Sequence, residues 1–316
     1  MLIQLHPDVM RGDDIGLKSD WWSDARFAQQ QFTGANPTTI TQASTEWIRA
    51  FKDAAAKQGY SSASDTIAAA GSKSLFVQDC SYFRAAVGAG DADVLISRTP
   101  GADDRYECAS VTLFELNPDG KLHPLAIVID WKGSMEKSVV IFNKRLQPHD
   151  PFYAEPTEAE KNDWPWRYAK TCAQTSDWIR HEMAIHLVHT HLVEEVIIVA
   201  ANRSFPSDHP VFRLLEPHWF RTLSLNAAAR DTLVPDIIID LVGISNTQAM
   251  SFINYAFTTF DFCGKYIPND LVSHLLEFFT ILGHVSGVTR SNWTTFPSNP
   301  TKSLTLPNRC CLRWQC

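Results

Sequence analysis

Residues 181–191 read His-Glu-Met-Ala-Ile-His-Leu-Val-His-Thr-His, and this stretch decides how the rest of the chain is interpreted. It lies within a run from Trp166 to Ala201 that contains neither Gly nor Pro. A run of about 36 residues is roughly three times the mean length of an α-helix. We therefore predict a mainly α-helical fold built around one long central helix, with a break near its end.

The spacing of the histidines in this run is unusual for an α-helix. His181, His186 and His191 follow one another at intervals of five residues. With about 3.6 residues per turn, five residues rotate by roughly 140°, so the three side chains would not share a face. A π-bulge widens the turn and brings positions i and i+5 together, often at functional sites. Because imidazole suits iron, zinc and copper, such a defect would make this cluster a candidate metal site.

Two other interpretations of the cluster compete with a π-helical metal site. A helix whose histidines face solvent or satisfied partners would show the same clustering. A zinc hydrolase is suggested by His181-Glu182, but the motif His-Glu-x-x-His needs its second histidine at position 185. That position is Ile185. The sequence therefore disfavours a zinc peptidase and leaves the other two interpretations open.

The flanking sequence predicts a β-hairpin and further helices. The strand-like stretches 111–116 and 125–129 enclose the turn sequence Asn117-Pro118-Asp119-Gly120. Apolar residues on one side predict a helix over 45–58, and helices are expected again over 221–230 and 232–244. The stretch 233–244 is apolar enough to predict burial.

Composition excludes several classes of protein. The net charge of −7, without a basic stripe, argues against nucleic-acid binding, which needs clustered Lys and Arg. No apolar run reaches the roughly 20 residues of a membrane span, so no transmembrane segment is expected. Residues 1–16 lack the apolar core of a signal peptide. Seven scattered cysteines favour a reducing compartment, so we expect a cytoplasmic protein.

The histidine stretch resembles the iron-binding signature of the lipoxygenase family. The matching positions are His181, Glu182, His186, His191 and Glu195. The resemblance implies that His186 and His191 bind the metal, whereas His181 and Glu195 lie beside it without binding. Further matches occur in order along the chain, at 24–40, 122–129, 200–203, 209–218 and 226–230.

The resemblance implies a fold and a chemistry. We expect a partial lipoxygenase catalytic domain over 1–278, holding one non-haem iron ion, with manganese as the alternative. Its substrates would be a polyunsaturated fatty acid and O2, and a peripheral contact with lipid is left open. The resemblance also implies that a metal-bound hydroxide, and not a side chain, abstracts hydrogen from the fatty acid. In the substrate pocket, Ala229 matches the position that influences stereochemistry, and Leu233 matches the one that packs against the reactive carbon.

The remaining family ligands have no counterpart in the sequence given. The family supplies a third histidine, an Asn or similar residue four positions later, and a terminal Ile or Val carboxylate. After His218 the chain has only His274 and His284, and its last residue is Cys316. We expect residues 279–316 to be an unrelated, disordered tail and oxygenation to be impaired. The alternative is a catalytically inactive lipoxygenase-like fragment with a lipid-binding role or no independent role.

Overall fold

The computed structural model describes residues 18–33, 39–97, 104–147, 156–238 and 241–261. Almost all of these belong to one compact unit that ends at Phe260. The stretch 1–16, judged not to be a signal peptide, and the expected tail 279–316 lie outside the described residues, as do His274 and His284.

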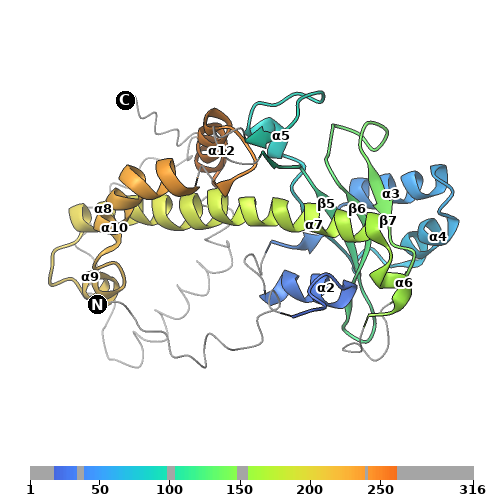
Figure 1. Ribbon diagram of the computed structural model, residues 1–316. Coiled ribbons are helices and arrows are strands. Elements are labelled where there is room, and N and C mark those ends of the chain that lie inside the picture. Colours follow the sequence, from blue (N-terminus) through green and yellow to red (C-terminus); the bar gives the residue numbers. More distant parts are fainter. Residues whose placement is uncertain (1–17, 34–38, 98–103, 148–155, 239–240, 262–316) are drawn as a thin grey trace, which may run out of the picture. The chain divides into compact units, whose positions relative to one another are not determined.

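A five-stranded antiparallel sheet forms one end of this unit, and the predicted hairpin is its centre (Figure 1). Strands β5 and β6 pair from Val111 opposite Val128 to Leu116 opposite Leu122, which confirms the hairpin. Gly120 closes the turn with a φ of +77°, a conformation that glycine adopts without a steric penalty. The sheet is larger than the hairpin expected from the sequence, because short strands add to both sides. Its order is β1 (Thr41–Gln42), β2 (Leu75–Asp79), β5 (Val111–Leu116), β6 (Leu122–Val128) and β7 (Val140–Phe142).

The predicted fold class, mainly helical with a long central helix, is confirmed. The long helix runs without interruption over 41 residues, Trp164–Ser204, so the break predicted near its end is wrong. It consists of α7 (Trp164–Ile179), the π-helix η2 (Arg180–Leu192) and α8 (Val193–Ser204). By length and composition alone it could also cross a membrane, but core helices of soluble proteins share both properties.

The other elements are shorter. The helix predicted over 45–58 is present as α3. The remaining helices are α2 (Asp24–Thr33), α3 (Thr45–Lys57), α4 (Ser61–Ala69), α5 (Phe83–Ala86), α6 (Glu158–Lys161), α9 (Pro210–Leu215), η3 (Glu216–His218), α10 (Thr222–Ala228), η4 (Ala229–Ile238) and α12 (Asn246–Thr258). Two further short strands, β3 (Ile96–Ser97) and β4 (Arg105–Tyr106), form a separate ribbon.

A buried ionic cluster fixes α7 to α2 and the sheet. The carboxylate of Asp24 accepts hydrogen bonds from Trp166 Nε1 at 2.6 Å and from Lys170 Nζ at 2.7 Å. Arg145 pairs with the same carboxylate at 3.4 Å. Burial alone would raise the pKa of Asp24, but attraction to Lys170, His123 and Arg145 lowers it to about 2. The N-terminal part of the long helix is therefore held by charge as well as by apolar packing.

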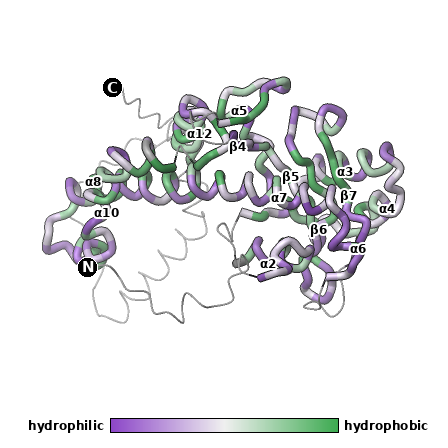
Figure 2. Tube along the Cα trace, in the orientation of Figure 1, coloured by the Kyte–Doolittle hydropathy of each residue, from purple (hydrophilic) through white to green (hydrophobic). Residues whose placement is uncertain are grey.

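From the Val, Ile and Leu residues near 192–199, the sequence also predicts that the long helix, from Trp166 to about Val199, is the most buried helix of the domain. This prediction is wrong at the C-terminal end of the helix. Ile198 is 1% exposed, but Val196 is 56% and Ile197 is 41% exposed. The covered face of α8 packs on Phe212 and Trp219. Figure 2 shows hydrophobic and hydrophilic residues alternating along the helix. One face of α8 is therefore apolar and open to solvent.

The prediction of a buried helix over 233–244 is also wrong. The helix η4 ends at Ile238, with Pro235 inside it. Leu233, Ile237 and Leu241 are 42%, 48% and 47% exposed. An apolar run does not by itself produce burial, because burial requires a second element to pack against it. Val242 and Ile244, beyond the helix, are buried in the core, and Val234 and Ile238 of the helix pack against it while partly exposed.

Candidate metal centre

The π-helix η2 places two histidines face to face. Nε2 of His186 lies 3.2 Å from Nε2 of His191, and the ring centroids are 5.0 Å apart. A π-turn holds more residues than an α-turn, so positions five apart come into line. The spacing predicted a widened turn that brings His186 and His191 face to face, and the structure confirms both features.

Hydrogen bonds fix which nitrogen of His191 carries its proton. Nδ1 of His191 lies 2.9 Å from Oδ1 of Asn226. The amide group of Asn226 donates to the backbone oxygen of His191 at 2.9 Å and to Glu195 at 3.1 Å. Because both donors are engaged, Oδ1 must face the imidazole, and His191 Nδ1 must donate to it. Nε2 of the neutral ring is then an acceptor directed at His186.

The second imidazole is oriented in a similar way. Nδ1 of His186 lies 3.4 Å from Oε2 of Glu182, an oxygen that accepts when the carboxylate is ionised. Nε2 of His186 is then also an acceptor. Two lone pairs that face each other at 3.2 Å repel unless a cation joins them. Two nitrogens bound at about 2.1 Å and at right angles on one metal lie about 3.0 Å apart. The observed pair therefore suits one transition-metal ion.

The two predicted neighbours of the metal ligands lie close to them. The ring of His181 stacks on that of His186, with centroids 5.5 Å apart and planes at 13°. Glu195 accepts from Arg230 at 2.7 Å, and this bond lowers the pKa of its carboxyl group. Glu195 therefore acts on His191 through Asn226 and not by direct contact.

Asn226 is the residue that sequence reasoning missed. It was noted only as part of a matching segment, yet it is the one buried residue of α10 and is 2% exposed. A small polar side chain inside a helix is unfavourable unless it has a partner. Its position among Leu and Ala residues could have identified it.

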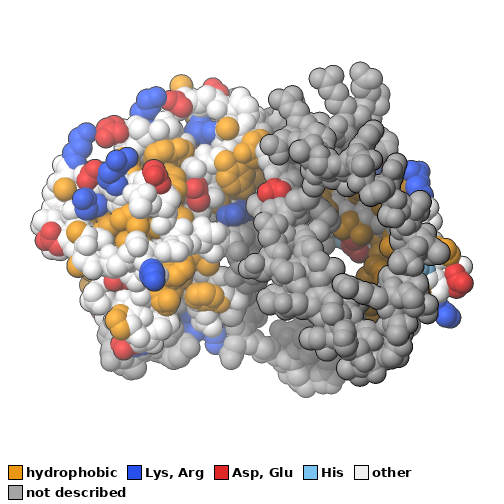
Figure 3. All heavy atoms as spheres, turned by 180° about the vertical axis from the view of Figure 1, so that it is seen from behind, with side chains coloured by type: hydrophobic (Ala, Val, Ile, Leu, Met, Phe, Trp, Pro, Cys, Tyr) orange, Lys and Arg blue, Asp and Glu red, His pale blue; other side chains and the backbone are white. Residues whose placement is uncertain are grey.

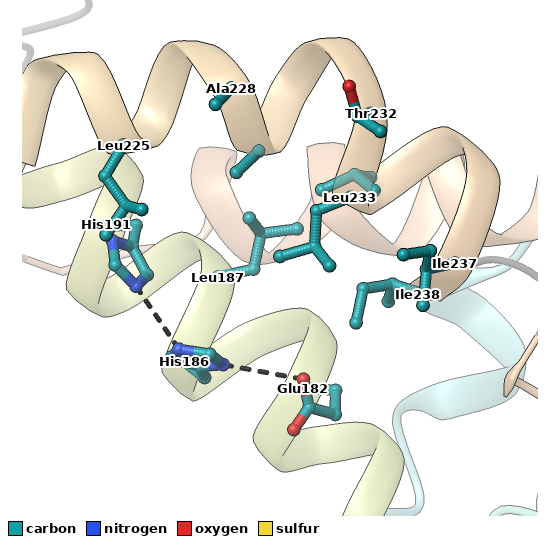
Figure 4. A pocket seen from close by; sticks show the side chains of 12 residues that line it. Glu182, His186, Leu187, His191, Leu225, Ala228, Thr232, Leu233, Ile237 and Ile238 are labelled. Carbon is teal, nitrogen blue, oxygen red and sulfur yellow. Dashed lines mark hydrogen bonds and ion pairs between the residues drawn. The ribbon is translucent and has the colours of Figure 1, made fainter. Parts of the chain in front are cut away.

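An apolar pocket of about 380 Å³ opens beside the two imidazoles (Figure 4). Ala229 and Leu233, predicted to lie in a substrate pocket, are both in its wall. In Figure 4 the side chains of Leu187 and Leu233 lie between the two helices that form it. No Lys or Arg lines the pocket in the described part of the chain. The full lining is Glu182, His186, Leu187, His191, Leu225, Ala228, Ala229, Thr232, Leu233, Val234, Ile237 and Ile238.

A long central helix with a π-helical histidine pair beside an apolar pocket is the arrangement expected of a lipoxygenase catalytic domain. The lipoxygenase family model matches residues 4–277, and the chain belongs to that family. It is 51% identical over 266 residues to a manganese lipoxygenase of Pleurotus sapidus, covering 84% of this chain and 40% of the relative. A linoleate 9S-lipoxygenase of Oryza sativa is 28% identical over 275 residues, covering 84% of this chain and 31% of that relative.

Solved structures agree with the sequence comparisons. A crystal structure of a fungal lipoxygenase from Fusarium graminearum superposes with a TM-score of 0.75 at 46% identity. The match covers 84% of this chain and 42% of that one. The chain thus spans about two fifths of the length of these fungal relatives.

Proposed function

We propose that this protein is a metal-dependent dioxygenase that inserts O2 into polyunsaturated fatty acids to give hydroperoxides. The observation that carries the proposal is the pair of Nε2 acceptors at the mouth of an apolar pocket. The family and the names of the relatives, which include linoleate and polyunsaturated fatty acid lipoxygenases, support the substrate class.

His186 and His191 would hold the metal ion through Nε2. When bound, the ion supplies one-electron redox chemistry that imidazoles lack. Two neutral imidazoles do not distinguish iron from manganese, so iron, the metal expected first, stays a prediction. The 51% identity with a manganese lipoxygenase supports manganese. We therefore propose one non-haem ion, manganese or iron, with Glu182 and Asn226 as the groups that hold the imidazoles in the binding tautomer.

The pocket walls would bind the hydrocarbon chain of the substrate. Eight of the twelve lining residues in the described part of the chain are Leu, Ile, Val or Ala, and none is cationic. Such a surface binds methylene groups and excludes water, whereas a carboxylate would need a cation. Leu233 lies on η4, opposite Leu187 on η2, so the two bracket a chain that passes the imidazoles (Figure 4). We propose Ala229 and Leu233 as substrate-contacting residues.

A second candidate function is fatty-acid binding without turnover. The observation in its favour is that the pocket wall is mostly apolar, with eight Leu, Ile, Val or Ala residues among the twelve that line it. Nucleic acid is not expected as a partner under either function: on the face shown in Figure 3, Lys and Arg side chains are interspersed with Asp and Glu. The expected impairment of oxygenation by the 316-residue chain stays a prediction.

One set of assays separates these functions. The purified chain, loaded with Mn²⁺ or Fe²⁺, is mixed with linoleate, and conjugated-diene absorbance is followed while bound metal is quantified by elemental analysis. Diene formation that disappears in both His186→Ala and His191→Ala supports the dioxygenase. Linoleate binding without diene formation, weakened by Leu233→Asp, supports the binding protein. His218→Ala, outside the pocket lining, serves as the control in both assays.

A further inference from the structure

Three of the four histidines of η2, His181, His186 and His191, form a row. The end of this row at His181 carries a second set of metal-binding groups. The side chains of His181, Glu182 and His186 offer ligand atoms that all lie within 4.8 Å of one another. Two imidazoles and one carboxylate are a ligand set that binds divalent transition metals. We infer that these three residues form an accessory divalent-cation site that shares His186 with the proposed metal centre and cannot be filled together with it.

The geometry needs only a small contraction to hold an ion. Oε1 of Glu182 lies 3.8 Å from Nε2 of His181, and Oε2 lies 3.4 Å from Nδ1 of His186. Ligand atoms on opposite sides of a metal bound at about 2.1 Å are about 4.2 Å apart, so the widest pair must close by less than about 1 Å. The side chains of His181 and His186 are 28% and 45% exposed, so an ion could reach them from solvent.

The charge of Glu182 also favours a cation here. In the described part of the chain its ion-pair partners are the two histidines, which carry no charge when neutral. At 19% side-chain exposure, the carboxylate is partly withdrawn from water, and no Lys or Arg among the described residues forms an ion pair with it. A divalent ion would supply that charge.

Sharing His186 makes the two sites mutually exclusive. The proposed centre uses Nε2 of His186, whereas the accessory site uses Nδ1, which faces Glu182. A neutral imidazole keeps a proton on one nitrogen, so an ion at Nδ1 moves that proton to Nε2. The proton then points at Nε2 of His191, 3.2 Å away, and blocks the centre. This exclusivity rests on the proposed function, but the accessory site itself does not.

Zinc is the expected occupant. Zn²⁺ binds mixed nitrogen and oxygen ligands more tightly than Mn²⁺ or Fe²⁺ do. Occupation by Zn²⁺ would therefore oppose loading of the redox metal, and the linkage must be reciprocal.

Zn²⁺ titration of the full chain by calorimetry tests the site. His191→Ala removes the proposed centre and should still bind one equivalent of Zn²⁺. Adding His181→Ala to that variant should weaken binding by at least about tenfold, or about 1.4 kcal/mol. Adding His189→Ala instead should change nothing, because that ring packs on Phe260 outside the row. Failure of His191→Ala to bind Zn²⁺, or binding that survives His181→Ala, would overturn the inference.

A separate experiment tests whether the accessory site and the proposed metal centre exclude each other. Bound Mn²⁺, followed by electron paramagnetic resonance, should be released by Zn²⁺ at lower concentrations from the wild type than from His181→Ala. Equal release from both proteins contradicts exclusivity. If His191→Ala does not reduce Mn²⁺ binding while calorimetry still detects the accessory site, the proposed centre fails and the accessory site stands.

Discussion

Replacing Asn226 by alanine should weaken metal binding although both proposed ligands, His186 and His191, stay in the chain. Asn226 is 2% exposed and makes three hydrogen bonds, at 2.9, 2.9 and 3.1 Å, to His191 and Glu195. At about 1 kcal/mol for each bond, the variant should lose about 3 kcal/mol of unfolding free energy. Without the acceptor at Nδ1, His191 can place its proton on Nε2, where it blocks the metal. Losing such an orienting partner lowers metal affinity by about 10- to 100-fold.

The assay is Mn²⁺ binding by the folded variant, with thermal melts recorded on the same samples. Nitrogen-15 NMR of the imidazole reports the tautomer, which a merely structural role for Asn226 would leave unchanged. Asn202→Ala is the matched control, because that amide donates one bond, to Ile198 O at 2.8 Å, on the neighbouring helix α8. Metal affinity of Asn226→Ala within twofold of the wild type, with the Nδ1–H tautomer retained, would refute the reasoning.

Three further predictions concern the fold. Lys170→Met should lower the unfolding free energy by about 3 kcal/mol or more in urea titrations, because it leaves the buried Asp24 carboxylate without its nearest charge partner; a loss below 1 kcal/mol contradicts this. Because the folded-state pKa of Asp24 is about 2 and its ordinary value is 3.8, its ionised form stabilises the fold above about pH 4. That contribution, about 2 kcal/mol, should be lost as pH falls towards 2 and be much smaller in Lys170→Met. Gly243→Ala should lower the melting temperature sharply, since its Cβ would lie 2.4 Å from the backbone carbon of Tyr106, whereas Gly71→Ala meets nothing within 4 Å; equal melting temperatures would exclude the clash.

Sequence patterns within a few residues predicted the elements that depend on neighbouring residues alone. The hairpin 111–128 followed from its turn residues, and the widened turn followed from the five-residue interval between His186 and His191. The interactions that were missed join residues far apart in sequence. Asp24 meets Lys170 across 146 positions, and Asn226 meets His191 across 35. A hydrophobic periodicity in the sequence does not reveal such pairs. Each of these side chains, taken alone, resembles an ordinary polar residue.

The burial errors have a related cause. Hydrophobicity indicates that a side chain can be buried, but not whether another element packs against it. Ile197 and Ile198 are adjacent and chemically identical, yet one is 41% and the other 1% exposed. The difference comes from the position of each on α8 relative to Phe212 and Trp219, which lie on a neighbouring segment.

The anchoring of α7 at Asp24 has a mechanical consequence for the far end of the same helix. Trp166 and Lys170 reach one carboxylate from adjacent turns, so they fix the rotation of the helix about its own axis. His186 lies roughly 20 Å further along the same continuous helix. Because a hydrogen-bonded helix resists torsion, the direction in which the imidazole row points is set partly at α2, which packs on the sheet. The carboxylate of Asp24 therefore helps to set the orientation of the three imidazoles although it does not contact them.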